Sequence, residues 1–128
     1  MMRIPEDKEQ KVFGLLGLAR RARAVTIGMD ATLSALNKGI VKAILLANDI
    51  GKSSFKKLSR NVEEFETETY SEKGSIALVA FSNSEKLGVV LNKETVSIIG
   101  IVDAGFAKGI YKLALQDKDN NQEVEEIK

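Results

Sequence analysis

Hydrophobic positions along this chain alternate between a helical period and short apolar runs of strand length. An amphipathic helix is predicted near the amino terminus, where apolar residues recur every three or four positions at Val12, Leu15, Leu16, Ala19 and Ala22. Runs of strand length, several of them rich in β-branched residues, occupy residues 25–27, 42–47, 75–81 and 96–102. Helical patterns separate or follow these runs at residues 29–38, from 53 onwards, at 86–91 and at 104–115. This alternation predicts an α/β fold in which helices cover both faces of a sheet.

The segment 62–74 follows no single period. Val62 and Phe65 have helical spacing, whereas Phe65, Thr67 and Thr69 alternate as in a strand. We interpret this segment as the end of a helix followed by an acidic excursion. Because no apolar period continues beyond residue 115, we expect one domain over residues 1–115 and a polar, frayed tail over residues 116–128.

The composition excludes several kinds of chemistry. A chain of 128 residues is long enough for one domain with its own core, and this chain contains neither cysteine nor histidine. Thiol and imidazole nucleophiles and nearly all zinc sites are therefore excluded, and no motif indicates another cofactor. Asp49, Asp103 and Lys108 lie near expected loops or helix starts, but no marked nucleophile accompanies them. We therefore expect a protein that is not an enzyme.

The formal net charge of +1 conceals an asymmetry between the two halves of the chain. Residues 1–60 hold 12 Lys and Arg against 5 Asp and Glu, whereas residues 61–128 hold 7 against 13. A basic half is either a solvated surface or a face that binds a polyanion, and the charge count alone does not choose between them. The polar amino terminus and the lack of a long apolar run predict a soluble, cytoplasmic protein without membrane contact.

A basic helix end, a glycine turn and a second helix start follow one another within residues 13–42. Gly28 leads into the helical pattern at 29–38, and the amino end of a helix binds phosphate through its free N–H groups and its dipole. The cations that flank this turn are Arg20, Arg21, Arg23, Lys38 and Lys42. Each has a structural explanation as well, because cations stabilise the carboxyl end of a helix and surface lysines are usually solvated. Their joint placement around Gly28 favours a nucleic-acid site.

Five segments of the chain carry a family resemblance. They are LLGLARRAR (15–23), the glycine turn at Gly28, KAILLANDIGKSS (42–54), SEKLGVVLNKE (84–94) and IIGIVDAGFAKGI (98–110). Over residues 12–115 the chain resembles the kink-turn RNA-binding ribosomal protein superfamily, the L-seven-Ae and L-thirty-e proteins, and within it the small bacterial YlxQ-type members. The resemblance implies a three-layer α-β-α sandwich with a small mixed four-stranded sheet. It also implies a noncatalytic protein whose partner is structured, kink-turn-like RNA, ribosomal or other noncoding, alone or within a ribonucleoprotein such as the ribosome. We further expect the domain to be a monomer.

In this superfamily the kinked RNA is held by a glycine turn and the first turns of the next helix, written Gly-x-Asn-Glu-x-x-Lys in archaeal members. The N–H groups hold phosphate, the Asn and Glu read guanine edges, and the Lys neutralises the backbone. The resemblance aligns this motif with Gly28, Met29, Asp30, Ala31 and Ser34. Only the glycine is retained, so base contacts worth roughly 1–3 kcal/mol each are lost.

The second contact in the family is the loop after the fourth helix, which corresponds to residues 92–96. Lys93 keeps a cation there, whereas Val89 and Val96 stand at positions that are often basic in bacterial members. The resemblance thus implies an RNA-binding surface made of Arg20, Arg21, Arg23, Gly28, Met29, Asp30, Ala31, Ser34, Lys38, Lys42 and Lys93. Two alternatives stay open. Asp30 is also explained as a simple helix cap, and the domain as a protein-interaction module like the growth-arrest-type members of the family.

Overall fold

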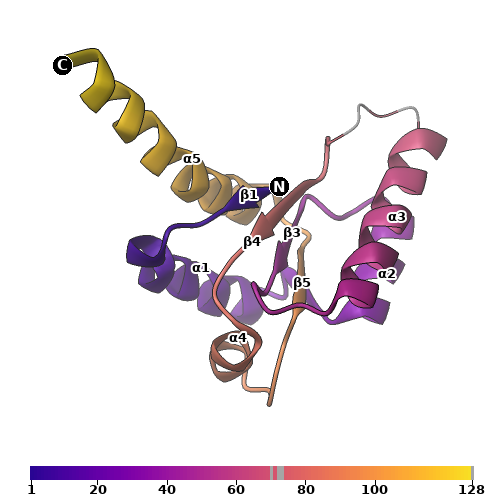
Figure 1. The fold of residues 1–128 in the computed structure, drawn as a ribbon. Helices are drawn as coiled ribbons and strands as arrows, with labels where there is room; N and C mark the ends of the chain where they lie inside the picture. The colour runs from indigo at the N-terminus through magenta and orange to yellow at the C-terminus, as the bar shows by residue number, and fades with distance from the viewer. Residues whose placement is uncertain (70, 72–73, 128) are drawn as a thin grey trace.

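The structure, a computed structural model, describes residues 1–69, 71 and 74–127, with side chains described up to residue 115. Helices and strands alternate along the described chain as the hydrophobic pattern predicts (Figure 1). In chain order they are β1 (Met2–Arg3), the 3-10 helix η1 (Glu6–Lys8), α1 (Glu9–Arg21), β2 (Val25–Ile27), α2 (Met29–Asn37), β3 (Ala43–Leu46), α3 (Lys52–Glu68), β4 (Ala77–Ala80), α4 (Ser84–Val90), β5 (Ile98–Ile101) and α5 (Ala104–Ile127). The α/β fold class is confirmed. No helix of the described residues is long and apolar enough to cross a membrane.

The sheet has five strands in the order β1-β4-β3-β5-β2, so the expected four-stranded sheet is wrong. β1, β4 and β3 are parallel, whereas β5 pairs antiparallel with both β3 and β2. The fifth strand is β1, where Met2 and Arg3 pair with Val79 and Ala80. Two residues cannot show a hydrophobic period, and this pair forms a strand only because Ile4 is buried beside it and donates its N–H to the Ala80 carbonyl at 3.1 Å.

The sheet separates two hydrophobic clusters. Along β3, Ala43 and Leu45 belong to the cluster under α1, α4 and α5, while Ile44 and Leu46 belong to the cluster under α2 and α3. This alternation is what a strand buried on both faces requires. Figure 1 shows the resulting layers, with α1 and α5 on one side of the sheet and α2 beside α3 on the other.

The ambiguous segment after residue 62 is helical as far as α3 extends, and the helix closes where the Thr69 N–H donates to the Phe65 carbonyl at 3.0 Å. The expected acidic excursion falls largely on residues 70, 72 and 73, which lie outside the described residues. At the carboxyl terminus the backbone of α5 stays helical to Ile127, through the segment expected to be a frayed tail. That the domain does not need residues 116–128 stays a prediction.

A buried carboxylate joins α3 to the start of β4. The side chain of Glu66 is only 4% exposed, and its Oε2 accepts hydrogen bonds from Ser75 Oγ at 3.0 Å and from the Ile76 N–H at 3.1 Å. Burial raises the pKa of Glu66, but hydrogen bonds from the backbone of Ile76, Gly74 and Ser75 and from the Ser75 hydroxyl outweigh it and hold the pKa below its ordinary value. The ionised form is therefore the one that the fold stabilises.

This lowered pKa predicts an acid-sensitive contribution to stability. The contribution of Glu66 is complete above the pKa of the unfolded chain and is lost as the pH falls through the lower, folded-state pKa. Glu66→Gln should lower the free energy of unfolding by about 1–3 kcal/mol near neutral pH, and by less at about pH 4 and below. Urea unfolding of both proteins over a pH series measures this difference. An equal loss at every pH would contradict it.

Candidate nucleic-acid interface

The turn between β2 and α2 depends on a glycine at position 28. Gly28 has φ 91° and ψ 171°, a conformation that residues with a Cβ rarely adopt. Its N–H donates to the Ile98 carbonyl at 2.8 Å, and its own carbonyl accepts from the Thr32 N–H at 3.2 Å. The N–H groups of the three residues between, 29 to 31, have no acceptor within the helix, as at any helix start. These groups form the amino end of α2 that an anion would meet.

The cap explanation of Asp30 is wrong. The residue at the N-cap of α2 is Gly28, and no side chain accepts a hydrogen bond there. Asp30 lies in the first turn with its side chain exposed, where a carboxylate still stabilises the positive end of the helix dipole. Ala31 and Ser34 are exposed as well, so no described contact occupies their side chains.

A buried threonine of α2 and a half-buried threonine of β2 hold the first turn of α2 against the sheet. Thr32 is fully buried beneath the helix, and its Oγ1 is 2.9 Å from Thr26 Oγ1 on β2. Gly100 on β5 provides the room for this pair, because a Cβ at position 100 would collide with the Thr26 hydroxyl. The turn at Gly28 therefore lies on rigid elements, which is what a precise binding geometry needs.

The loop that carries Lys93 reaches the same end of the sheet. It begins with a Schellman turn, in which Lys93 N–H donates to the Gly88 carbonyl at 2.7 Å and Asn92, at φ 59°, donates to the Val89 carbonyl at 3.2 Å. A Cβ at Gly88 would collide with the backbone of this loop, so the glycine permits the close packing. The loop then enters β5 at Ile98, whose carbonyl accepts from Gly28. Lys93 itself is exposed.

The arginines predicted around Gly28 lie at the opposite end of β5. Val102, just after β5, donates its N–H to the Ala24 carbonyl at 2.9 Å, and Lys42 donates its N–H to the Ile101 carbonyl at 2.8 Å. Ile98 and Ile101 are the two ends of the four-residue strand β5, about 10 Å apart. The structure thus divides the predicted residues into two groups. The turn group is Gly28, Met29, Asp30, Ala31, Ser34 and Lys93, and the arginine group is Arg20, Arg21, Arg23, Lys38 and Lys42.

Arg23 occupies a position that usually belongs to glycine. Its φ is 58°, and it follows the last turn of α1 in a second Schellman turn, with Arg23 N–H donating to the Arg20 carbonyl at 3.0 Å and Ala24 N–H to the Ala19 carbonyl at 2.8 Å. A left-handed conformation costs a residue with a Cβ about 1–2 kcal/mol. The favourable placement of Arg20 and Arg21 at the negative end of the α1 dipole does not explain why an arginine stands at position 23.

Four cations on α3 do not belong to the RNA-binding surface predicted from the sequence. They are Lys52, Lys56, Lys57 and Arg60, all of them exposed, and no acidic residue occurs between residues 52 and 60. α3 starts directly after the carboxyl end of β3, at the same end of the sheet as the turn group, and packs beside α2. In the sequence these residues form a run of positive charge without acidic residues. The run could be linked to Gly28 only once the structure places α3 beside α2.

None of the cations in these groups is neutralised by a carboxylate among the residues whose side chains are described. Within that part of the chain the single ion pair joins Lys86 to Glu9, and neither residue belongs to these groups. The same part of the chain contains no group of three or more acidic residues that could hold a metal ion. The arrangement can therefore bind an anion by N–H groups, helix dipole and free cations.

The fold is an α/β sandwich around a five-stranded mixed sheet, and comparison with protein families identifies the family to which it belongs. Residues 10–111 match the model of the Ribosomal protein L7Ae/L30e/S12e/Gadd45 family, and the chain belongs to this family.

Two curated relatives bear the same description. The RNA-binding protein YlxQ of Bacillus subtilis (strain 168) is 30% identical over 101 residues, which cover 79% of this chain and 92% of that protein. The RNA-binding protein YlxQ of Enterococcus faecium is 29% identical over 103 residues, covering 80% and 90%. The resemblance drawn from the five sequence segments is confirmed.

Two solved structures show the same fold. A protein with unknown function from Bacillus halodurans C has 30% sequence identity and a TM-score of 0.69, with 81% of this chain and 96% of that chain covered. The Giardia lamblia 15.5kD RNA binding protein has 14% identity and a TM-score of 0.66, with 88% of each chain covered. At that identity the second likeness concerns the fold alone.

The backbone conformation at position 23 generates a stability prediction. Arg23→Gly should raise the free energy of unfolding by about 0.5–1 kcal/mol, because glycine adopts the left-handed conformation without strain. Arg21→Gly, which removes the same side chain from within α1, should instead lower stability by about 1 kcal/mol. Urea unfolding of the two variants checks both signs. A loss of stability in Arg23→Gly would show that the arginine side chain itself stabilises the fold.

Proposed function

We propose that this protein binds structured, kink-turn-like RNA without catalysing a reaction, and that the turn group is the centre of the RNA contact. The observation that carries the proposal is the juxtaposition, at one end of the sheet, of the free amino end of α2, the Lys93 loop and the basic half of α3. The names of the YlxQ relatives and the family membership support it. A kinked backbone brings phosphates close together, so several N–H groups and cations at one place suit such RNA.

The side chains of the turn group favour recognition of shape over recognition of bases. The Ala31 side chain can accept no hydrogen bond and Ser34 carries no charge. This helix can therefore make few specific hydrogen bonds to base edges. Small side chains at these positions let a phosphate backbone approach α2 closely. Ala31, Ser34 and Lys38 follow the spacing of one helix face, which leads from the turn group toward the arginine group. We infer that one RNA strand runs along this face and meets the arginines about 10 Å farther on.

Protein docking is a second candidate function, favoured by a specific surface. An open apolar groove of about 550 Å³ lies between α1 and α5, with Leu15, Leu18 and Leu113 among its lining residues. Leu18 is half exposed, and on α4 Val89 is 79% exposed. Such surfaces suit a protein partner better than RNA. Both functions can reside on one domain, because the groove lies on the helical layer away from α2 and α3.

The cations of α3 provide a test of the RNA surface. Replacing Lys52 and Lys56 with Gln should weaken binding to a standard kink-turn RNA and reduce the slope of log affinity against log salt by roughly 0.7–0.9 for each lost phosphate contact. Lys11 and Lys112, in the groove between α1 and α5, give a control with the same loss of charge on the other layer. Fluorescence anisotropy over a salt series measures both. If the salt slopes of the two double variants are equal, α3 is not part of the RNA interface.

The turn group provides the second test. Asp30→Asn combined with Ala31→Glu and Ser34→Lys restores the archaeal motif on exposed positions of a helix that tolerates all three residues. The triple variant should bind a standard kink-turn at least tenfold more tightly, and should reject RNA that lacks the sheared G·A pairs, because the new side chains read base edges. Arg23→Gly should weaken the binding of both RNAs by the same factor. If the folded triple variant binds no more tightly than the native chain, this placement of the RNA is wrong and the docking function is preferred.

A further inference from the structure

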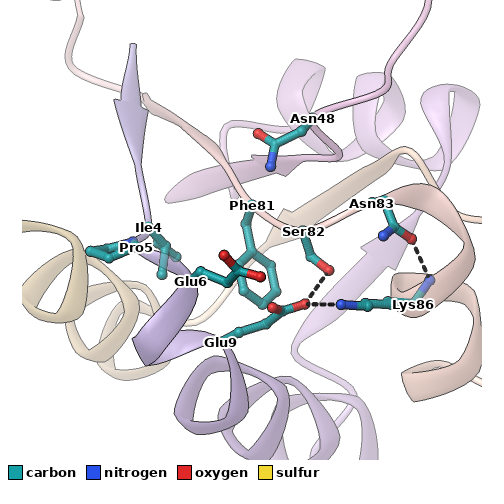
Figure 2. A pocket seen from close by; sticks show the side chains of 9 residues that line it. All are labelled: Ile4, Pro5, Glu6, Glu9, Asn48, Phe81, Ser82, Asn83 and Lys86. Atoms are coloured by element: carbon teal, nitrogen blue, oxygen red, sulfur yellow. Dashed lines mark hydrogen bonds and ion pairs between the residues drawn. The ribbon is translucent and has the colours of Figure 1, made fainter.

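A polar cavity outside the proposed RNA surface opens at the carboxyl ends of the three parallel strands. It measures about 310 Å³ and lies where β1, β4 and β3 end, the place at which open α/β sheets bind ligands (Figure 2). Ile4 and Phe81 form its apolar floor. Around it stand Glu6 on η1, Asn48 after β3, and Asn83 and Lys86 at the start of α4. A volume of this size suits a single small heterocycle better than a large cofactor.

The wall of the cavity is held by contacts between distant parts of the chain. Glu9 Oε1, at the start of α1, accepts a hydrogen bond from Ser82 Oγ at 2.6 Å and lies 3.5 Å from Lys86 Nζ. Ser82 has φ 57°, a conformation that is uncommon for serine and that aims its hydroxyl at Glu9. Glu9 and Ser82 are therefore positioning residues. Ser82 orients Glu9, and Glu9 pairs with the ammonium group of Lys86 at the rim.

The hydrogen-bond partners of the two asparagines determine which of their atoms stay free. Asn83 Oδ1 accepts from the Lys86 N–H at 2.9 Å, and Asn48 Oδ1 accepts from Arg3 Nη1 at 3.1 Å. Both side chains therefore keep the two N–H donors of Nδ2 available. On the opposite side, the Glu6 carboxylate has no hydrogen bond or ion pair to any residue whose side chain is described. One side of the cavity thus accepts hydrogen bonds and the other side donates them.

We propose that this cavity binds a guanine base. The Watson–Crick edge of guanine presents two adjacent N–H donors, N1–H and the N2 amino group, beside one acceptor, O6. The Glu6 carboxylate can accept from both donors at once, while Asn48, Asn83 or Lys86 donates to O6. Adenine and uracil each bring a ring acceptor or carbonyl against the carboxylate, and cytosine has only one amino donor. The lining holds two carboxylates, Glu6 and Glu9, against one lysine, so the cavity suits an uncharged base, and the phosphate of a nucleotide would lie outside it.

The guanine has two conceivable sources with the same chemistry, a free guanine nucleotide or an unpaired guanine of bound RNA. Unpaired bases can be splayed out of an RNA chain and hydrogen-bonded along their edges. The cavity lies at the same end of the sheet as the turn group, because Ala47 N–H, at the end of β3, donates to the Ser97 carbonyl just before β5 at 3.0 Å. Only the RNA source rests on the proposed function.

The nucleotide arm of the test uses the full chain and five nucleoside monophosphates. Titration with the guanosine compound should shift the NMR signals of the Nδ2 protons of Asn48 and Asn83, whereas the adenosine, cytidine and uridine compounds should not. Inosine monophosphate, which lacks the N2 amino group, should bind several-fold more weakly. Glu6→Gln should weaken guanosine binding about tenfold or more. Asp7→Asn is the matched control, since Asp7 is the exposed neighbour outside the cavity lining and should have no effect.

The RNA arm compares two kink-turn RNAs that differ by one unpaired nucleotide next to the kink, guanosine or adenosine. A preference for guanosine that Glu6→Gln removes and Asp7→Asn keeps would assign the cavity to RNA. Binding of guanosine monophosphate without such a preference would assign it to a free nucleotide. If the kink-turn RNA does not bind while the nucleotide does, the proposed function fails and this inference stands. If the RNA binds and neither arm shows a preference for guanine, this inference is overturned and the proposed function stands.

Discussion

The antiparallel pairing of β5 with both neighbours determines where every proposed RNA contact lies. Its amino end receives Gly28 through the bond to the Ile98 carbonyl, together with the Lys93 loop that leads into the strand. Its carboxyl end receives Lys42 and, through Ala24, the arginines of α1. β5 is buried on both faces, so neither end can shift without disturbing both hydrophobic clusters. The core thereby sets a fixed spacing between the two groups.

Much of this architecture was predictable from the sequence, because the signals are local. The apolar runs and amphipathic periods locate β2 to β5 and the helices between them, and family motifs locate the turn at Gly28. β1 could not be found in this way. A two-residue strand has no period of its own, and it exists only because β4 offers an unpaired edge beside the buried Ile4.

The errors at the site have a common physical origin, which is the difference between closeness in sequence and closeness in space. Arg23 lies five residues before Gly28, yet an extended strand of three residues stands between them and carries the two apart. The α3 cations are more than twenty residues from Gly28 and nevertheless begin at the same end of the sheet. Asp30 resembled a cap by residue type, but the glycine conformation at position 28 already starts the helix. A run of charged residues can therefore be assigned to one face of the molecule only when the directions of the strands are known.

The candidate interface and the cavity both contain residues other than glycine that adopt positive φ angles. In the described chain three residues other than glycine adopt them, namely Arg23, Ser82 and Asn92, and all three stand at helix boundaries. Glycine would relieve about 1–2 kcal/mol of backbone strain at each of these positions. The presence of a larger residue there therefore needs an explanation, such as a contact of its side chain. Ser82 has one in its hydrogen bond to Glu9, which shapes the cavity wall. Arg23 has no described partner, and its charge belongs to the arginine group. Under the proposed function, an RNA phosphate would give Arg23 such a contact.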